Sequence, residues 1–261
     1  MTTPTDHTES PVQPENQAYA PRSAFARVPS ALRLQFQPTV TLITVPVMIF
    51  FGSWLIAVGI GLWIYHEGSL TAEEPFYTGA SQSTLWALVF LAAYSASHTF
   101  PFSMALSYSR RTFMMGVLLA FGGVSASYGA AFGLAAGLER ITDGFGIESY
   151  TFNLPYLVDG PGGLVAAGAF AAVVCLLLML TGFFWAILYR RVGLVMLWII
   201  LLGAAVVILG LVMVIFQTDG WPVIWEWLLE QSAASLAAWL VLPVAGLAVL
   251  NYAVLRRATP A

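Results

Sequence analysis

The sequence predicts an all-α polytopic membrane protein with six transmembrane helices and with both termini in the cytoplasm. The first observation is composition: of 261 residues, 59% are hydrophobic and 9% are charged, whereas a soluble domain has about 45–50% apolar and about 25% charged residues. The second is a series of six long apolar runs, and the third is a one-sided distribution of arginine. These features exclude a soluble globular protein.

Each apolar run is long enough to cross a bilayer, because about 20 apolar residues in a helix span a hydrocarbon core about 30 Å thick. None of the six contains Asp, Glu, Lys or Arg. The runs are continuously apolar, whereas a barrel strand alternates lipid-facing and lumen-facing residues. The expected spans are therefore helices at 42–65, 83–106, 113–138, 164–188, 192–216 and 233–255.

The orientation follows from the charges, since positive residues in short loops stay on the cytoplasmic side. Nine of the ten arginines lie before the first span, in alternate loops or after the last span: Arg22, Arg27, Arg33, Arg110, Arg111, Arg190, Arg191, Arg256 and Arg257. Ten of the thirteen acids fall in the other loops: Glu67, Glu73, Glu74, Glu139, Asp143, Glu148, Asp159, Asp219, Glu226 and Glu230. Both termini are expected to be cytoplasmic.

The chain divides into a polar cytoplasmic tail at 1–22, an amphipathic juxtamembrane segment at 23–38, the transmembrane domain at 39–257 and a short tail at 258–261. The first tail is too hydrophilic to bury a core, which predicts disorder. The juxtamembrane segment is either a short interfacial helix that starts near Pro29 with Ser30 as its cap, or simply a basic flank.

Two outer loops carry more than a connection. The loop at 139–163 is rich in Gly, Pro and aromatic residues and exceeds the usual helix-to-helix link of about 2–8 residues, so it is expected to fold against the outer face. The segment at 219–231 has three tryptophans, Trp221, Trp225 and Trp227. It is either a short helix in the headgroup layer or part of an aromatic belt.

Composition also limits which ligands and reactions the protein could support. The chain has no lysine, which removes the phosphate-binding residue of a P-loop. A single cysteine, Cys175, and three histidines that are far apart provide no metal-ligand spacing, so no metal and no cofactor are expected. The arginines form no basic cluster with aromatic residues, so no nucleic acid is expected as a partner. The absence of charges within the spans disfavours an ion-driven carrier.

One polar group inside the second span stands out: Ser95, Ser97, His98 and Thr99 precede Pro101, where a broken helix could free backbone carbonyls. A lone histidine in such a group is more typical of interhelical hydrogen bonding. The alternative is an intramembrane enzyme that pairs His98 with Ser125 or Ser127. The surrounding sequence has no special turn chemistry, so no catalytic residue is expected. Small residues in the third and fourth spans predict close helix packing.

The stretch FPFSMALSYSRRTFMMGVLLAFG at 100–122 is the most distinctive of the chain. It resembles the first cytoplasmic loop of export-type (type-II) ABC transporter permeases, in particular the small six-span actinobacterial kind. The resemblance implies that a loop made of Ser107, Tyr108, Ser109, Arg110, Arg111 and Phe113 docks into an ATPase, with the lead-in helix beside it. Arg110 and Arg111 could equally be topology signals alone.

The resemblance implies a permease subunit of an ABC exporter in the bacterial plasma membrane, which moves a hydrophobic or amphiphilic substrate. Its expected partners are a separate cytoplasmic ABC ATPase subunit, a second permease in a homodimer or heterodimer, and the lipid bilayer. The alternatives are a non-transporting accessory or sensor protein and, third, an intramembrane enzyme.

Overall fold

The computed structural model describes residues 27–37, 40–68 and 75–257. The predicted tails at 1–22 and 258–261 lie outside these residues. Within the described part of the chain, five helices are long and apolar enough to cross a membrane: Leu42–His66, Gln82–Ala105, Arg110–Ile141, Gly163–Gln217 and Ala233–Arg256. The all-α prediction is confirmed for the described residues, since the only strands there, β1 (Phe76–Tyr77) and β2 (Ser149–Tyr150), have two residues each.

The elements follow the apolar runs closely. Two π-helical turns, η2 and η3, continue into the helices beside them, and the 3-10 turn η4 lies in the outer loop. The remaining elements in chain order are α1 (Val28–Gln35), η2 (Val40–Thr44), α2 (Val45–His66), α3 (Gln82–Tyr94), η3 (Ser95–Thr99), α4 (Phe100–Ala105), α5 (Arg110–Ile141), η4 (Gly144–Gly146), α6 (Pro155–Val158), α7 (Gly163–Gln217), α8 (Gly220–Glu230) and α9 (Ala233–Arg256).

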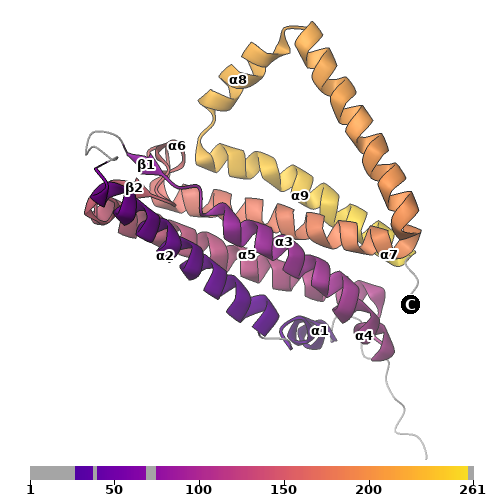
Figure 1. Cartoon of the computed structure of the whole chain (residues 1–261). Helices are drawn as coiled ribbons and strands as arrows, with labels where there is room; N and C mark the ends of the chain where they lie inside the picture. The colour runs from indigo at the N-terminus through magenta and orange to yellow at the C-terminus, as the bar shows by residue number, and fades with distance from the viewer. Residues whose placement is uncertain (1–26, 38–39, 69–74, 258–261) are drawn as a thin grey trace, which may run out of the picture.

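The fourth and fifth expected spans form one element, α7, of 55 residues. A straight helix of that length would measure about 80 Å, and α7 is not straight. Gly193 has φ 77 and ψ 174, a conformation outside the helical region that glycine adopts readily. At this point the chain turns sharply, beside the C-terminal end of α9 (Figure 1). Only Gly193 departs from helical geometry between the two runs, and the helix includes Arg190 and Arg191, so five long helices are found in the described residues where the sequence predicted six.

The core lies where α3, α5, α9 and the first half of α7 pack together (Figure 1). Phe113, Phe121 and Phe183 are fully buried there. Glycines let α5 and α7 approach closely: a Cβ added to Gly168 would lie 2.7 Å from the carbonyl oxygen of Gly129. This contact joins the small-residue runs of the predicted third and fourth spans, as the sequence indicated.

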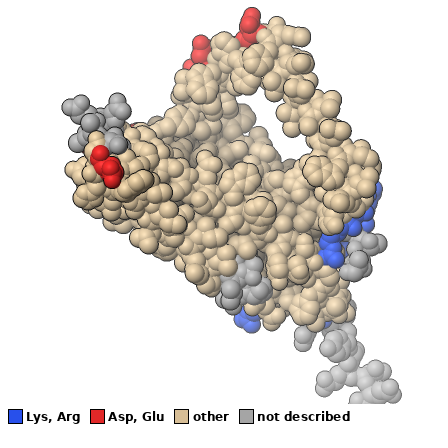
Figure 2. All heavy atoms as spheres, viewed as in Figure 1, with Lys and Arg blue, Asp and Glu red and all other residues tan. Residues whose placement is uncertain are grey.

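The second half of α7 and α8 stand away from this core. No residue between 194 and 230 is buried, and we call this segment the arm. Figures 1 and 2 show it as two sides of a triangle above α9, with an open gap between. The second half of α7 is apolar all round, so in a membrane, lipid or another protein would surround it.

The charges are divided between the two ends of the molecule. Figure 2 shows arginine at the end where α7 turns and near α1, and shows acids at the opposite end and on α8. Arg140 is the exception predicted from the sequence, and it forms an ion pair with Asp159 at 3.7 Å. The arginine-bearing end and the acidic end of the bundle are therefore distinct surfaces.

Candidate functional site

The loop between α4 and α5 is a defined turn. Ser107 has φ 59, in the left-handed region. Ser109 then caps α5, because its Oγ accepts a hydrogen bond from the backbone N–H of Thr112 at 3.0 Å. Such a cap typically stabilises a helix by about 1 kcal/mol. The predicted coupling segment is thus the N-terminal boundary of α5, one of the core helices.

Helix α1 lies beside this loop, as the resemblance implied. The Arg27 guanidinium donates to the carbonyl of Ser107 at 3.3 Å and lies 5.9 Å from the centre of the Tyr108 ring. Further along α1, a Cβ added to Gly116 of α5 would lie 2.9 Å from the backbone of Ala31. The lead-in segment is therefore a helix packed on α5 and not merely a basic flank.

The cap predicted for this helix is corrected. α1 begins at Val28, with Arg27 at the N-cap position, and Ser30 lies inside the helix. The Ser30 hydroxyl donates to the carbonyl of Arg27 at 2.8 Å. Since Pro29 has no N–H, one of the donors that a cap would satisfy is absent.

The remaining residues of the loop divide between surface and core. Ser109 and Arg111 are exposed, and the Arg110 guanidinium donates to the carbonyl of Arg256, which joins α5 to the end of α9. Phe113 is fully buried against Phe100 and Phe183, so the structure does not make it available to a partner.

Sequence reasoning missed Leu106, which is 48% exposed beside the loop. The signal in the sequence is a leucine at the end of the second predicted span, directly before the polar segment SYSRR.

The polar group of the second span is a break in the helix. Pro101 lacks an N–H, so the carbonyl of Ser97, four residues earlier, has no helical partner. Arg190 of α7 donates to that carbonyl at 2.8 Å and to the carbonyl of Ala96 at 3.4 Å. Arg190 therefore satisfies the break and ties α7 to the second span.

The four polar side chains of this group serve different contacts. Ser95 donates to the Oε1 atom of Gln35 at 2.6 Å, and both residues are buried. Ser97 donates to the carbonyl of Ala93 at 3.0 Å, and Thr99 is 8% exposed. The group joins α1 to the second span through Gln35, a residue that sequence reasoning did not single out.

His98 does not meet a serine. It is exposed and its ring stacks on Tyr94, with ring centres 4.2 Å apart. Ser125 contacts the sulfur of Met179 at 3.7 Å, and Ser127 donates to the carbonyl of Gly123 at 2.9 Å. The structure therefore gives neither serine the base that nucleophilic catalysis would require.

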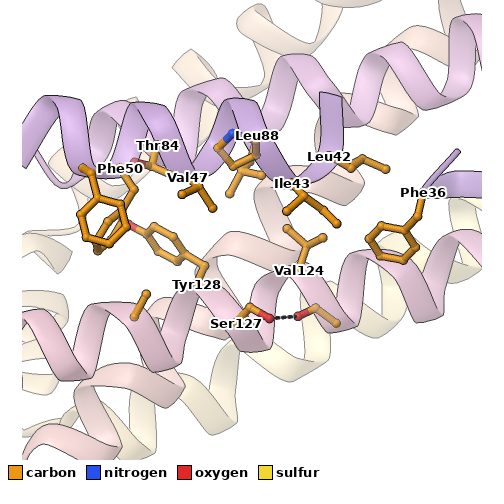
Figure 3. Close-up of a pocket in the computed structure, with 14 residues that line it drawn as sticks. Phe36, Leu42, Ile43, Val47, Phe50, Thr84, Leu88, Val124, Ser127 and Tyr128 are labelled. Carbon is orange, nitrogen blue, oxygen red and sulfur yellow. Dashed lines mark hydrogen bonds between the residues drawn. The ribbon is translucent and has the colours of Figure 1, made fainter. Parts of the chain in front are cut away.

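An apolar cavity of about 410 Å³ lies between α2, α3 and α5. Figure 3 shows side chains of these helices around one shared space. Its wall includes Phe50, Leu88 and Val124, together with Phe36, Leu42, Ile43, Pro46, Val47, Phe51, Thr84, Gly123, Ser127, Tyr128 and Ala131. Ile43, Val47 and Phe51 are each about half exposed, so the cavity is open along the outer surface of α2. Volumes of about 300–1,000 Å³ are typical of ligand sites.

Two of the three hydroxyls among the described wall residues, those of Tyr128 and Ser127, donate hydrogen bonds to backbone carbonyls. Tyr128 donates to the carbonyl of Ser81 at 3.0 Å, and Ser127 donates to Gly123, as the dashed line in Figure 3 marks. No ionisable side chain other than Tyr128 lines the cavity. The site suits an alkyl or aromatic group and offers little to a charged one.

One end of the cavity is closed by a hydrogen bond between α2 and α5. The indole Nε1 of Trp54 donates to the Oε1 atom of Glu139 at 2.8 Å. Phe152 packs between these helices, with its ring 4.9 Å from that of Phe50 and 5.5 Å from that of Trp54. Helix α2 is thus held against α5 at the acidic end and is separated from it along the cavity.

Glu139 is fully buried and organises the loop between α5 and α7. Its Oε2 atom accepts hydrogen bonds from the backbone N–H groups of Thr151, Phe152 and Asn153 at 3.0, 2.8 and 2.9 Å. With Trp54, four donors therefore converge on one carboxylate. Hydrogen bonds to a charged group contribute about 1.5–3 kcal/mol each.

The rest of the outer loop forms a cap over this carboxylate. Strand β2 pairs in parallel with β1, and Phe152 and Val158 are buried. Burial and the nearby Glu148 carboxylate raise the pKa of the Tyr150 hydroxyl. As predicted, this loop folds against the helices, and it lies at the acidic end of the bundle.

No group of three potential metal ligands is found among the residues that the structure describes. No family model, no curated protein and no solved structure matches this chain. The features that bear on function are the apolar cavity, the loop between α4 and α5, and the two charged ends of the molecule.

Proposed function

We propose that this chain is the membrane-spanning permease subunit of an exporter that moves a hydrophobic or amphiphilic substrate across the bacterial plasma membrane and is driven by a separate ABC ATPase. The proposal rests on the loop between α4 and α5 at the arginine-bearing end, which is held by the contact of Arg27 with Ser107 and by the cap that Ser109 forms on α5. A surface turn held by α1 on one side and by the start of α5 on the other can transmit a partner's movement directly into the helical core.

The contact surface of this loop follows from what is exposed. Leu106, Ser107 and Arg111 are exposed, and Tyr108 is half-buried beneath Arg27. An apolar anchor beside a cationic rim is a common composition for a docking surface. Arg110, by contrast, is bound to the end of α9, so its removal would disturb the fold as well as the docking.

The cavity between α2 and α5 supports the substrate class. Its wall is apolar, it opens along the exposed surface of α2, which would face the hydrocarbon of the bilayer, and the hydroxyls of Ser127 and Tyr128 are already paired. A substrate with an alkyl or aromatic portion could enter from the membrane without first crossing the headgroups.

The proposed topology has six crossings with both termini in the cytoplasm. The two halves of α7 each have the length of a span, and Gly193 would be the turn between the fourth and the fifth. The arginines at this turn then lie on the same side as those of α1 and α9, in agreement with the positive-inside rule.

The test is reconstitution of the full chain with a candidate ABC ATPase in lipid, with ATP hydrolysis and substrate movement measured separately. Leu106→Ser and Arg111→Gln together should weaken the complex by about tenfold or more, because an apolar anchor is removed with its rim charge. Arg33→Gln, a charge change at an exposed position of α1 away from the loop, is the matched control. Equal assembly and equal transport by the double variant would contradict the assignment of the loop.

The second candidate is a non-transporting accessory or sensor protein, which the folded outer cap favours, since an ordered surface at the acidic end could hold an external partner. The two proposals predict different results in the same preparation. A sensor would show no substrate movement with any ATPase, and a partner would protect the cap instead of the loop at 106–111.

A further inference from the structure

A second pocket, distinct from the apolar cavity and from the loop, lies where α7 turns beside the end of α9. It has a volume of about 450 Å³ and is lined by six residues: Arg191, Leu250, Ala253, Val254, Arg256 and Arg257. Half of its lining is therefore arginine, contributed by two elements that are distant in sequence.

The positive charge of this pocket is not balanced by carboxylates in its wall. No acid is among the lining residues that the structure describes, and the described acids gather at the opposite end and on α8 (Figure 2). The C-terminus of α9 is a partial negative charge that favours one nearby cation. Three arginines around a single cavity exceed what that dipole requires.

The geometry of the pocket is fixed by its neighbours. Arg110 donates to the carbonyl of Arg256 and so joins the end of α9 to the start of α5. Asn251, one turn earlier, donates to the carbonyl of Leu180 on α7 at 3.0 Å. The end of α9 is therefore held on both sides, and Arg191 precedes the turn at Gly193 by two residues.

The rest of the lining is apolar and leads away from the arginines along α9. Leu250, Ala253 and Val254 form this wall, and Val249 and Leu242 continue the exposed apolar surface towards the middle of the helix, at 69% and 64% exposure. A ligand that matches both parts has an anionic head and an alkyl chain. Guanidinium groups bind phosphate by paired hydrogen bonds.

We propose that this pocket binds an anionic phospholipid, with its phosphate between Arg191, Arg256 and Arg257 and an acyl chain along α9. Basic pockets between membrane helices are suited to such headgroups. The site does not depend on transport or on an ATPase. A free phosphate ion shares the head chemistry but would leave the apolar wall unoccupied.

The experiment uses the full chain purified in an uncharged detergent and native mass spectrometry of the protein with added ligand. We expect phosphatidylglycerol to bind as one tightly held molecule and phosphatidylcholine to bind more weakly. Each basic residue near a membrane surface contributes about fivefold to the affinity for an anionic lipid, so Arg191→Gln, Arg256→Gln and Arg257→Gln combined should weaken binding by about a hundredfold. Arg33→Gln, an exposed charge at the same end but outside the pocket, should leave the affinity unchanged.

Three results would overturn the proposal: equal binding of the two lipids, equal loss in the Arg33→Gln variant, or displacement of phosphatidylglycerol by millimolar inorganic phosphate, which would indicate a free-anion site. If the triple variant does not fold, Arg257→Gln alone tests the same site at the residue that follows the helix, with an expected loss of about fivefold. Replacement of the three arginines by lysine keeps the charge, and the lysine variant should retain binding to within about tenfold.

Discussion

Replacement of Glu139 by glutamine should open the outer cap while leaving the helical core folded. The carboxylate accepts three backbone N–H groups on one oxygen and the Trp54 indole on the other. Glutamine keeps one carbonyl oxygen, which accepts about two hydrogen bonds, and replaces the other oxygen with a donor. At least two buried donors then lose their acceptor, and each such loss costs about 1–3 kcal/mol. The expected cost is about 4 kcal/mol.

Hydrogen exchange measured by mass spectrometry reports this change directly, because the amides of Thr151, Phe152 and Asn153 are themselves the donors. About 4 kcal/mol corresponds to an acceleration of roughly a thousandfold in their exchange if the cap opens before each event. Asp143→Asn is the matched control: it removes a carboxylate from the same cap at an exposed position with φ 47, which asparagine tolerates. Unchanged exchange in Glu139→Gln, or equal acceleration in Asp143→Asn, would refute the reasoning.

Three further predictions concern packing, the helix break and topology. Gly168→Val should destabilise the contact between α5 and α7 by about 3 kcal/mol or more, measured as loss of thermal stability in detergent, because its side chain would enter space held by α5 backbone. Arg190→Gln should cost about 1.5–3 kcal/mol of unfolding free energy, since the carbonyl of Ser97 loses a charged donor, and Arg190→Lys should restore part of the loss. Single cysteines at Asp143 and Glu226 should react with an impermeant reagent from outside the cell, and reaction of either one only from the cytoplasm would contradict the proposed topology.

Much of the fold could be predicted from local sequence. The long apolar runs and the asymmetry of arginine are properties of each segment taken alone, and they gave the helices and the two charged ends. The small-residue runs predicted close helix packing, which the contact of Gly129 with Gly168 shows, but they did not identify the pair. Pro101 predicted free carbonyls, although their partner, Arg190, was interpreted only as a topology signal.

The features that could not be predicted depend on contacts between distant residues. In the sequence, nothing distinguishes Glu139 from any other acid that follows a predicted span. It is buried because the loop folds back and brings the backbone N–H groups of residues 151–153 to its carboxylate. Phe113 was assigned to a partner contact because it follows the arginines, whereas the first turn of α5 directs it into the core. The pair Arg190 and Arg191 marked the boundary between the fourth and fifth runs, but hydropathy could not show that the chain turns at Gly193, within two residues of that pair and without a loop.

The sideways opening of the cavity has a consequence for how any ligand would be measured. A molecule that enters from the hydrocarbon is sampled at its concentration in the bilayer, which exceeds its aqueous concentration by the partition coefficient. Occupancy would then depend on the mole fraction of ligand per lipid and would fall as empty vesicles are added at constant total ligand. Two compounds with equal intrinsic affinity for the wall of Phe50, Leu88 and Val124 would differ in apparent potency by the ratio of their partition coefficients. The apparent selectivity of such a site therefore depends both on the affinity of the wall for each compound and on how each compound partitions into the bilayer.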